Sequence, residues 1–298
     1  MKVPAFSAQL ASPTGSVERA LTDPERWVVE EKFDGIRALV TFDESGLEIR
    51  NRHGDNKGRL TNAPHIERAL REWAHARPKV WEGTVVDGEL VADTWNATMH
   101  LLGSAGKVQG DAGGLKFIAF DMPFFEGADH RGMPLAWRQG LLHGSFGEIV
   151  SDPLLVSQLL APTPGMVEEI FAKGAEGVML KDRTAVYESG GRKSWFKIKQ
   201  VRTADAFIVG YTAGQGKYAD TIGAIKLGQY RDGAVKTVTQ ISGMNDETRY
   251  AVGNDRAGHL GRVIEFEFQE QTAASYRHPR FLRWRLDKQP TECTWEAS

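Results

Sequence analysis

A short pattern near the N-terminus, Lys-x-Asp-Gly-x-Arg from Lys32 to Arg37, constrains this chain more than any other feature. Residues 27–31 before it and 36–42 after it are rich in β-branched and aromatic side chains, so both flanks are expected to be strands. Gly35 permits a tight backbone path between them. The pattern therefore predicts a lysine that is held by a rigid scaffold, at a turn between two strands, and that faces a cleft.

A lysine in such a place can act as a nucleophile. An amine attacks phosphorus only in its neutral form, so the pKa of a nucleophilic lysine must fall from about 10.4 towards neutrality. Desolvation and nearby positive charge both favour the neutral amine. The alternative is an ordinary surface lysine in a hairpin, and the remainder of the chain has to decide between the two.

Length and composition bound the class of protein. A chain of 298 residues with 41% hydrophobic and 26% charged residues predicts two globular domains of ordinary size. No apolar run is long enough to span a membrane, and residues 1–15 lack the apolar core of a signal peptide. Cys293 is the only cysteine, which excludes an intrachain disulfide and a cysteine-based metal site. Together these features favour the cytoplasm.

The net charge of −2 does not indicate a nucleic-acid binder, but positive charge is concentrated locally. The first basic stretch has no acid between its members, and the second has only Asp287. They consist of Arg192, Lys193, Lys197, Lys199 and Arg202, and of Arg277, Arg280, Arg283, Arg285 and Lys288. Such stretches fit a polyanion bound along a defined track, or simply two solvated faces.

The first two thirds of the chain mix helices and strands. Pro64 begins the clearest helix, since apolar residues follow it at i, i+3, i+4 and i+7 spacing. Helices are expected over 17–21, 64–73, 135–143 and 164–174, strands over 47–50, 84–91, 115–122, 177–180 and 194–199, and a glycine-rich loop over 103–114.

The pattern changes after about Arg202. Five short strands are expected, over 206–211, 224–230, 235–241, 263–268 and 281–286, with a helix over 246–252 before the fourth. This order is that of an OB-fold barrel, a module that commonly binds nucleic acid. We therefore expect a first domain over residues 1–201 and an OB-fold domain over 202–298, with a hinge near Gln200 to Asp205.

Two acids stand in unusual places. Glu89 lies inside an otherwise apolar strand, and Glu176 directly precedes another. Buried acids are costly unless they are paired or bind a metal. Two carboxylates aimed into one cleft would suit Mg²⁺ beside a triphosphate, although each could instead pair with a core arginine.

Cations and an aromatic ring complete a set. Arg37 and Arg52 offer planar forks of donors to phosphate or sugar. Alternation along one strand puts Lys197 and Lys199 on the same face, where a phosphate between them would relieve their repulsion. Phe120, at the end of a strand, offers a face on which a base can stack, unless it is ordinary core. Together with the nucleophile and the two acids, these residues are what nucleotidyl transfer requires.

The chain resembles the covalent nucleotidyltransferases, and within them the ATP-dependent DNA ligases. Seven motifs occur in the family's order and cover nearly the whole chain. They are the nucleophile motif Lys32–Arg37, then Asn51–Gly54 (with Asn in place of the usual Ser), Asp87–Glu89, Phe117–Asp121, Glu176–Lys181, Lys197–Lys199 and Arg285–Lys288. The resemblance implies an α+β adenylation domain of antiparallel sheets and helices, followed by an all-β OB-fold domain.

It also implies an activity and roles. Lys32 would take AMP from ATP, pass it to the 5′-phosphate of a nick in double-stranded DNA, and the 3′-hydroxyl would then seal the strand. By this resemblance, Glu30 would read the adenine, Phe120 would stack on the base, and Arg37 and Arg52 would contact the ribose and the nick phosphate. Glu89 and Glu176 would contact the metal (Mg²⁺, alternatively Mn²⁺) and the ribose. Lys197 and Lys199 would contact the α-phosphate, and Arg285 and Lys288 the pyrophosphate. A clamp of this kind needs no partner subunit, so we expect a monomer without membrane attachment.

The short segment before Lys32 resembles the minimal two-domain ligases, in which an extra DNA-binding domain is lacking. Three other functions remain open from sequence. An mRNA capping guanylyltransferase shares most of the motifs but would form lysyl-GMP. An RNA ligase usually lacks the OB-fold domain that carries Arg285 to Lys288. A non-catalytic nucleic-acid-binding protein of the same fold would have no need of the amine of Lys32.

Overall fold

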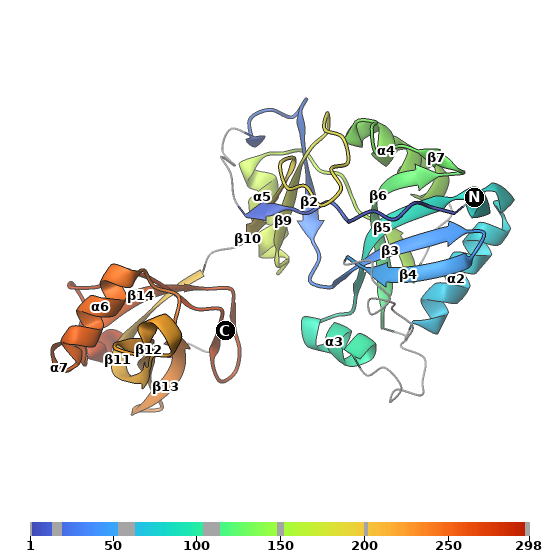
Figure 1. The fold of residues 1–298 in the computed structure, drawn as a ribbon. Coiled ribbons are helices and arrows are strands. Elements are labelled where there is room, and N and C mark those ends of the chain that lie inside the picture. Colours follow the sequence, from blue (N-terminus) through green and yellow to red (C-terminus); the bar gives the residue numbers. More distant parts are fainter. Residues whose placement is uncertain are drawn as a thin grey trace. The chain divides into compact units, whose positions relative to one another are not determined.

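The computed structural model describes residues 2–13, 20–52, 63–103, 114–147, 152–199 and 202–295. The chain divides into two compact units, Met1–Ile198 and Lys199–Ser298 (Figure 1). No helix in these described ranges is long and apolar enough to cross a membrane. Residues 17–19 of the expected helix over 17–21 lie outside the described residues, as do residues 104–113 of the expected loop over 103–114 and Gln200 and Val201 of the expected hinge.

Unit 1 contains two sheets. The larger has the strand order β4-β3-β5-β6-β7, with β8 paired to β6, and the smaller has the order β1-β10-β9-β2. The larger sheet consists of β3 (Ile36–Asp43), β4 (Gly46–Asn51), β5 (Thr84–Val91), β6 (Lys116–Phe125), β7 (Ala128–Asp129) and β8 (Leu154–Val156). The smaller consists of β1 (Ser12–Pro13), β2 (Trp27–Lys32), β9 (Gly177–Asp182) and β10 (Trp195–Lys199). Most neighbouring strands are antiparallel, as the sequence predicted for this domain.

Helices cover these sheets. The helices of unit 1 are α2 (Pro64–His75), α3 (Trp95–Gly103), α4 (Leu135–Leu142) and α5 (Pro164–Ala172). Helix α2 buries Ile66, Leu70 and Trp73 in the main core, which confirms the spacing seen in the sequence. Thr163 caps α5 by accepting a hydrogen bond from the backbone of Met166 at 3.2 Å. Short turns of helix follow at Pro78–Glu82 and His143–Gly147.

The Lys32 turn joins the two sheets. Strand β2 ends at Lys32 and pairs with β9, whereas β3 begins at Ile36 and pairs with β4 and β5. The two flanking strands are therefore both confirmed, but they do not form a hairpin with each other. A Cβ on Gly35 would meet the carbonyl of Leu90 and lie 2.5 Å from Cγ1 of Val91, so the turn packs too closely on β5 for any other residue.

Unit 1 differs from the expectation at helix α3 and at the end of strand β6. Helix α3 was not predicted. Strand β6 was expected to end before Pro123, yet it continues to Phe125. The pairing with β5 jumps from Asp121 to Phe124, so Pro123 lies in a bulge where no backbone donor is needed.

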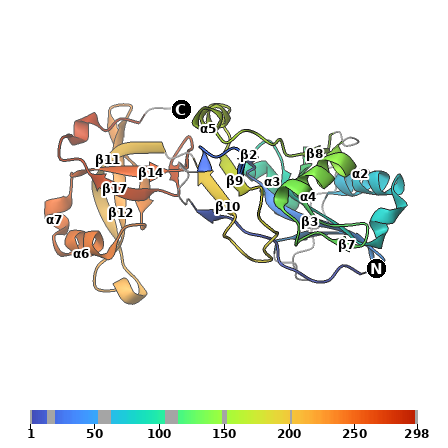
Figure 2. The same ribbon diagram turned by 90° about the horizontal axis from the view of Figure 1, so that it is seen from above.

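Unit 2 is a five-stranded barrel-like sheet with the order β13-β12-β11-β14-β17. Figure 2 labels four of these strands, β12, β11, β14 and β17. Its strands are β11 (Arg202–Ala213), β12 (Ile222–Arg231), β13 (Ala234–Ile241), β14 (Val263–Phe268) and β17 (Arg280–Trp284), and its helices are α6 (Asp246–Asn254) and α7 (Arg256–His259). A parallel bridge between Gly243 and Arg280 links the two ends of the sheet. All five expected strands and the helix before the fourth are confirmed, and this order is that of a partly open OB-fold barrel.

Smaller elements complete unit 2. A two-strand ribbon joins β15 (Glu270–Gln271) to β16 (Tyr276–Arg277). Single helical turns run over Gly216–Tyr218 and Pro290–Glu292. The core of the barrel gathers apolar residues of β11, β12, β13 and β14, among them Ile208, Leu227, Val238 and Phe266.

We expect Gly35→Ala to lower the free energy of unfolding by more than about 1 kcal/mol, because the added methyl overlaps the backbone of β5. Gly140→Ala is the matched control. It lies inside α4, where an added Cβ meets nothing within 4 Å, so we expect it to stabilise the protein by up to about 1 kcal/mol. Urea denaturation followed by tryptophan fluorescence measures both, and an unchanged midpoint for Gly35→Ala would contradict the close packing.

Candidate functional site

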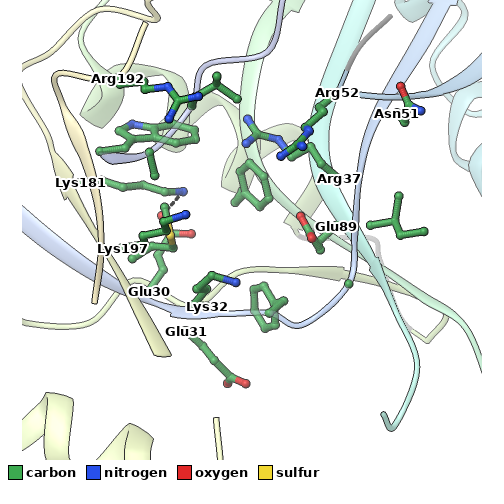
Figure 3. Close-up of a pocket in the computed structure, with 18 of the residues that line it drawn as sticks. Glu30, Glu31, Lys32, Arg37, Asn51, Arg52, Glu89, Lys181, Arg192 and Lys197 are labelled. Atoms are coloured by element: carbon green, nitrogen blue, oxygen red, sulfur yellow. Dashed lines mark ion pairs between the residues drawn. The ribbon is translucent and has the colours of Figure 1, made fainter. Parts of the chain in front are cut away.

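A cavity of about 470 Å³ lies in unit 1 beside the Lys32 turn (Figure 3). Its walls come from both sheets and include many of the residues predicted from sequence, namely Glu30, Lys32, Arg37, Arg52, Glu89, Phe120 and Lys197. Residues that the sequence did not single out for the site also line it, among them Trp95, Lys181, Arg192 and Trp195. The volume suits a nucleotide-sized ligand.

Lys32 lies at the end of β2 and forms an ion pair with Glu176. The two side chains are only 21% and 18% exposed, so the amine is not a solvated surface group. Glu176 directly precedes β9, the strand that pairs with β2, which is why two residues far apart in the chain meet here. An amine attacks phosphorus only in its neutral form, so this ion pair has to be broken before Lys32 can act as a nucleophile.

Arg37 is fixed by a buried carboxylate. Its Nε and Nη2 atoms each donate to Asp87 at 2.6 Å, and Asp87 is fully buried on the neighbouring strand β5. The hydroxyl of Tyr187 donates to the same carboxylate at 2.7 Å. Three donors on one buried acid hold the guanidinium in a single orientation at the wall of the cavity.

The electrostatics of Arg37 follow from this pairing. Burial lowers the pKa of its guanidinium, but attraction to Asp87 and the hydrogen bonds with it more than compensate, and the net pKa lies well above its ordinary value. Arg37 therefore remains charged at any physiological pH. It is a permanent cation at the cavity wall.

Glu89 behaves in the opposite way. Burial raises the pKa of its carboxyl to about 7, and the negative charges of Asp87 and Glu176 act in the same direction. Attraction to Arg37 and Lys32 only partly offsets this. At neutral pH the carboxyl is close to half protonated, and a cation brought near it would favour the charged form.

Glu30 is paired inside the protein. Its Oε1 atom accepts a hydrogen bond from Nε2 of Gln139 at 2.9 Å and lies 2.8 Å from the ammonium of Lys181. The side chains of Glu30 and Lys181 are both about 2% exposed. Figure 3 shows this pair at one wall of the cavity.

Aromatic rings and cations alternate along the same wall. Phe120 meets Trp195 edge to face, with ring centroids 5.9 Å apart. The guanidinium of Arg37 lies 4.7 Å from the ring of Phe120, and the ammonium of Lys181 lies 4.4 Å from it. Phe120 is only 9% exposed and packs in a small apolar cluster with Val28, Leu135 and Trp195, and it also lines the cavity.

The lysine pair of β10 is divided between the two units. Lys197 lines the cavity, whereas Lys199 begins unit 2 and donates to Gln269 at 3.1 Å. The expected alternation is confirmed, since Phe196 and Ile198 pack with Val167 and Ile170 of α5 in a separate apolar cluster. The structure therefore brings Lys197 to the cavity wall and leaves Lys199 out of it.

Arg285 and Lys288 belong to unit 2, where acids hold them. Arg285 Nη1 lies 2.9 Å from both oxygens of Asp205, and Lys288 Nζ lies 2.5 Å from Oδ2 of Asp205. Hydrogen bonding with Asp287 raises the pKa of Arg285, and the same contact lowers the pKa of Asp287. These residues form a compact charge cluster on β11 and the segment that follows β17.

The second basic stretch is therefore less basic than its sequence suggests. The sequence showed only Asp287 as an opposing charge, and this was wrong. The other acids come from distant segments and are paired as Arg277 with Glu270, Arg283 with Glu265, and Arg285 with Asp205. Strand pairing brings them together, and spacing along the chain gives no sign of it.

Sequence reasoning also missed several residues of the site. Asp87 was seen as part of a motif but not as the partner of Arg37. Tyr187 gave no signal, because it lies 100 residues from the carboxylate that it contacts. In the parts of the chain that the structure describes, no three His, Cys, Asp or Glu side chains form a metal site by themselves. Any ion at Glu89 and Glu176 would need ligand or water oxygens as well.

Comparison with known proteins identifies the family to which this chain belongs. The model described as ATP dependent DNA ligase domain matches residues 8–199. A DNA ligase of Methanothrix thermoacetophila is 28% identical over 95% of this chain and 56% of its own length. The multifunctional non-homologous end joining protein LigD of Pseudomonas aeruginosa is 31% identical over 68% of this chain and 24% of its own.

Solved structures agree in fold. A structure from a study of Lig E DNA ligases has a TM-score of 0.65 at 23% sequence identity. The match covers 95% of this chain and 100% of that chain. At that identity the likeness concerns the fold alone. The chain spans only about half the length of the first curated relatives that it matches, 56% and 55%.

We expect Asp87→Asn to destabilise the protein by about 3–5 kcal/mol, because it leaves Arg37 with an uncompensated charge in a buried place. Asp129→Asn is the control. It breaks the exposed pair with Arg131, and we expect it to cost less than about 1 kcal/mol. Chemical denaturation at neutral pH measures both, and equal costs for the two variants would contradict the role assigned to Asp87.

The raised pKa of Glu89 predicts a pH-dependent stability. Between about pH 4.5 and 7 the unfolded chain loses the Glu89 proton while the folded chain keeps it, so this residue makes the protein less stable as the pH rises. Glu89→Gln removes this pH dependence. We expect its free energy of unfolding to exceed that of the original protein by little at pH 5 and by roughly 3 kcal/mol at pH 8. Denaturation curves in chelator-containing buffers measure it, and a pH-independent difference would refute the raised pKa.

Proposed function

Because the chain belongs to the ATP-dependent DNA ligase domain family, we propose that it seals nicks with a 5′-phosphate and a 3′-hydroxyl in duplex DNA, at the expense of ATP. The observation that carries the proposal is the position of Lys32. Its amine lies at a cavity wall against Glu176, in a cavity that is also lined by Arg37, Arg52 and Lys197. A nucleophile surrounded by cations is suited to attack a polyphosphate.

In the first step, the neutral amine of Lys32 attacks the α-phosphorus of ATP. A bond forms between nitrogen and phosphorus, the bond to the pyrophosphate oxygen breaks, and the amine loses its remaining extra proton. Arg37 and Lys197 supply positive charge that favours the neutral amine and offsets the charge of the phosphates. The product is AMP bound covalently to Lys32.

The other site residues hold the nucleotide. Glu30 would read the amino group of adenine, and Phe120 would stack on the base. Arg52 and Arg37 would contact the ribose and the phosphate at the nick. Lys197 and Lys199 would contact the α-phosphate. Glu30, Phe120, Arg52 and Lys197 all line one cavity with Lys32, which supports a common ligand.

Glu89 and Glu176 would hold Mg²⁺, or Mn²⁺ in its place. The two acids fit such an ion, because Mg²⁺ takes one or two carboxylates when phosphate and water oxygens complete its shell. Burial, and to a smaller extent the charges of Asp87 and Glu176, raises the pKa of Glu89, and a divalent cation would favour its charged form. When bound, the ion would neutralise charge on the triphosphate and on the leaving pyrophosphate.

Two further steps complete the reaction. An oxygen of the 5′-phosphate at the nick attacks the phosphorus of lysyl-AMP, and the bond between nitrogen and phosphorus breaks. The 3′-hydroxyl then attacks the adenylated 5′-phosphate, a phosphodiester bond forms, and AMP leaves. Arg37 keeps its orientation through all three steps, because Asp87 and Tyr187 hold it independently of any ligand.

We assign an adenylation domain to residues 1–201 and an OB-fold domain to residues 202–298. Arg285 and Lys288 of the OB-fold domain would orient the leaving pyrophosphate when that domain closes. The protein would act on nicked double-stranded DNA as a monomer. Its proposed substrates, ATP and DNA, are consistent with action in the cytoplasm.

We expect Lys32→Arg to form no AMP adduct, with a rate reduced by more than about a thousandfold, because a guanidinium does not lose its proton in a protein. The arginine keeps a positive partner for Glu176, so the fold should survive. Mass spectrometry after incubation with ATP and Mg²⁺ measures the adduct on the intact protein.

Lys173→Arg is the matched control, since Lys173 is an exposed lysine paired with Glu169 on the surface of unit 1. It should form the adduct at the original rate. Retained adduct formation by Lys32→Arg would show that another residue is the nucleophile. An adduct formed by the original protein with GTP and not with ATP would favour a capping enzyme instead.

A further inference from the structure

We propose that Gln139 and Lys181 determine the preference for ATP over GTP, by holding the Glu30 carboxylate so that one chosen oxygen faces the nucleotide base. The inference rests on the proposed function, since it concerns the nucleotide that Lys32 attacks. It adds two residues that act on the base through Glu30, as positioning residues.

Glu30 is placed to meet the base of a nucleotide that Lys32 attacks. Both residues lie on β2, two positions apart, and alternation along a strand puts them on the same face. Both line the same cavity. The base-reading group and the nucleophile are therefore carried by one rigid element, about 7 Å apart along the strand.

The two partners of Glu30 bind the same oxygen. Nε2 of Gln139 donates to Oε1 at 2.9 Å, and the ammonium of Lys181 lies 2.8 Å from Oε1 as well. The amide of Gln139 donates a hydrogen bond, whereas the Lys181 ammonium forms an ion pair with Oε1 but has no partner in hydrogen-bond geometry among the described residues. The arrangement thus leaves Oε2 as an acceptor for a ligand in the cavity.

An acceptor at this place distinguishes the two purines. Adenine carries an amino group, a hydrogen-bond donor, where guanine carries a carbonyl oxygen, an acceptor. A carboxylate oxygen would accept a hydrogen bond from the amino group of adenine and would repel the carbonyl oxygen of guanine. A site that is built to pair with a polar group rejects a ligand with the wrong group strongly, because a buried polar atom is left unpaired.

The partners are themselves held firmly. Gln139 is a buried residue of α4, and Lys181 is a buried residue of β9. The Lys181 ammonium lies 4.4 Å from the ring of Phe120 and 4.3 Å from that of Trp195. With its partners fixed from two other elements, the Glu30 carboxylate has little freedom to rotate and to present a different oxygen.

The test measures the ratio of the adenylation rate with ATP to the nucleotidylation rate with GTP, as kcat/KM for adduct formation in Mg²⁺. We expect Gln139→Leu and Lys181→Met each to lower this ratio by about tenfold or more, because a carboxylate that is free to turn reads the base less strictly. The ratio does not depend on how much of a variant is folded, since both nucleotides meet the same population.

Gln229→Leu is the matched control. Gln229 is a buried glutamine of unit 2 that donates to the backbone of Asp205 at 2.8 Å and accepts from Tyr276 at 3.0 Å. It should keep the original ratio even if its stability falls. A fall in the control as large as in the two variants would overturn the proposal, because the effect would not be local to Glu30.

Two other results would be decisive. If the original protein forms the AMP adduct and both variants keep its ATP-to-GTP ratio, Gln139 and Lys181 are structural residues only, and the inference fails while the proposed function stands. If the original protein forms no adduct with either nucleotide, the proposed function fails and the inference fails with it.

Discussion

The buried carboxylate of Asp87 is the interaction on which the cavity depends. A fully buried acid inside a sheet is costly unless its charge is paired and its oxygens accept hydrogen bonds. Arg37 on β3 supplies the charge, and Tyr187, which follows the smaller sheet's β9, supplies a third donor. Satisfying this one carboxylate therefore brings a strand of the larger sheet and a segment from the smaller sheet together, with the cavity beside them.

The crossing of the chain between the two sheets places the remaining charges. Lys32 ends β2 in one sheet, and Glu89 lies on β5 of the other. The turn that joins β2 to β3 therefore brings the Lys32 ammonium and the carboxylates of Glu89 and Glu176 into a small volume. Glu176 takes the Lys32 ammonium, and Glu89 is left with a pKa near 7 because burial and neighbouring acids disfavour its charged form. This arrangement fits the nucleotidyl transfer that we propose, in which a cation and a polyanion would bind together.

Sequence reasoning found much of this. Motif spacing located Lys32, Arg37, Glu89 and Phe120, and hydrophobic periodicity located the helix at Pro64 and the five strands of unit 2. It failed where a contact crosses a long stretch of chain. Tyr187, the partners of Glu30 and the acids opposite Arg283 and Arg285 all meet their contacts through strand pairing or helix packing, which spacing along one chain does not encode.

The sequence by itself determined the order of most elements and the choice of candidate site residues, because periodicity and short motifs are local properties. Only the tertiary structure decided which charges are neutralised and which face the cavity. Lys32 and Lys181 both line the cavity and both belong to recognisable motifs, yet the first is 21% exposed beside Glu176 and the second is 2% exposed against Glu30 and two aromatic rings. The physical reason is that the state of an ionisable group depends on its burial and on its nearest charges, and those are set by the packing of distant segments.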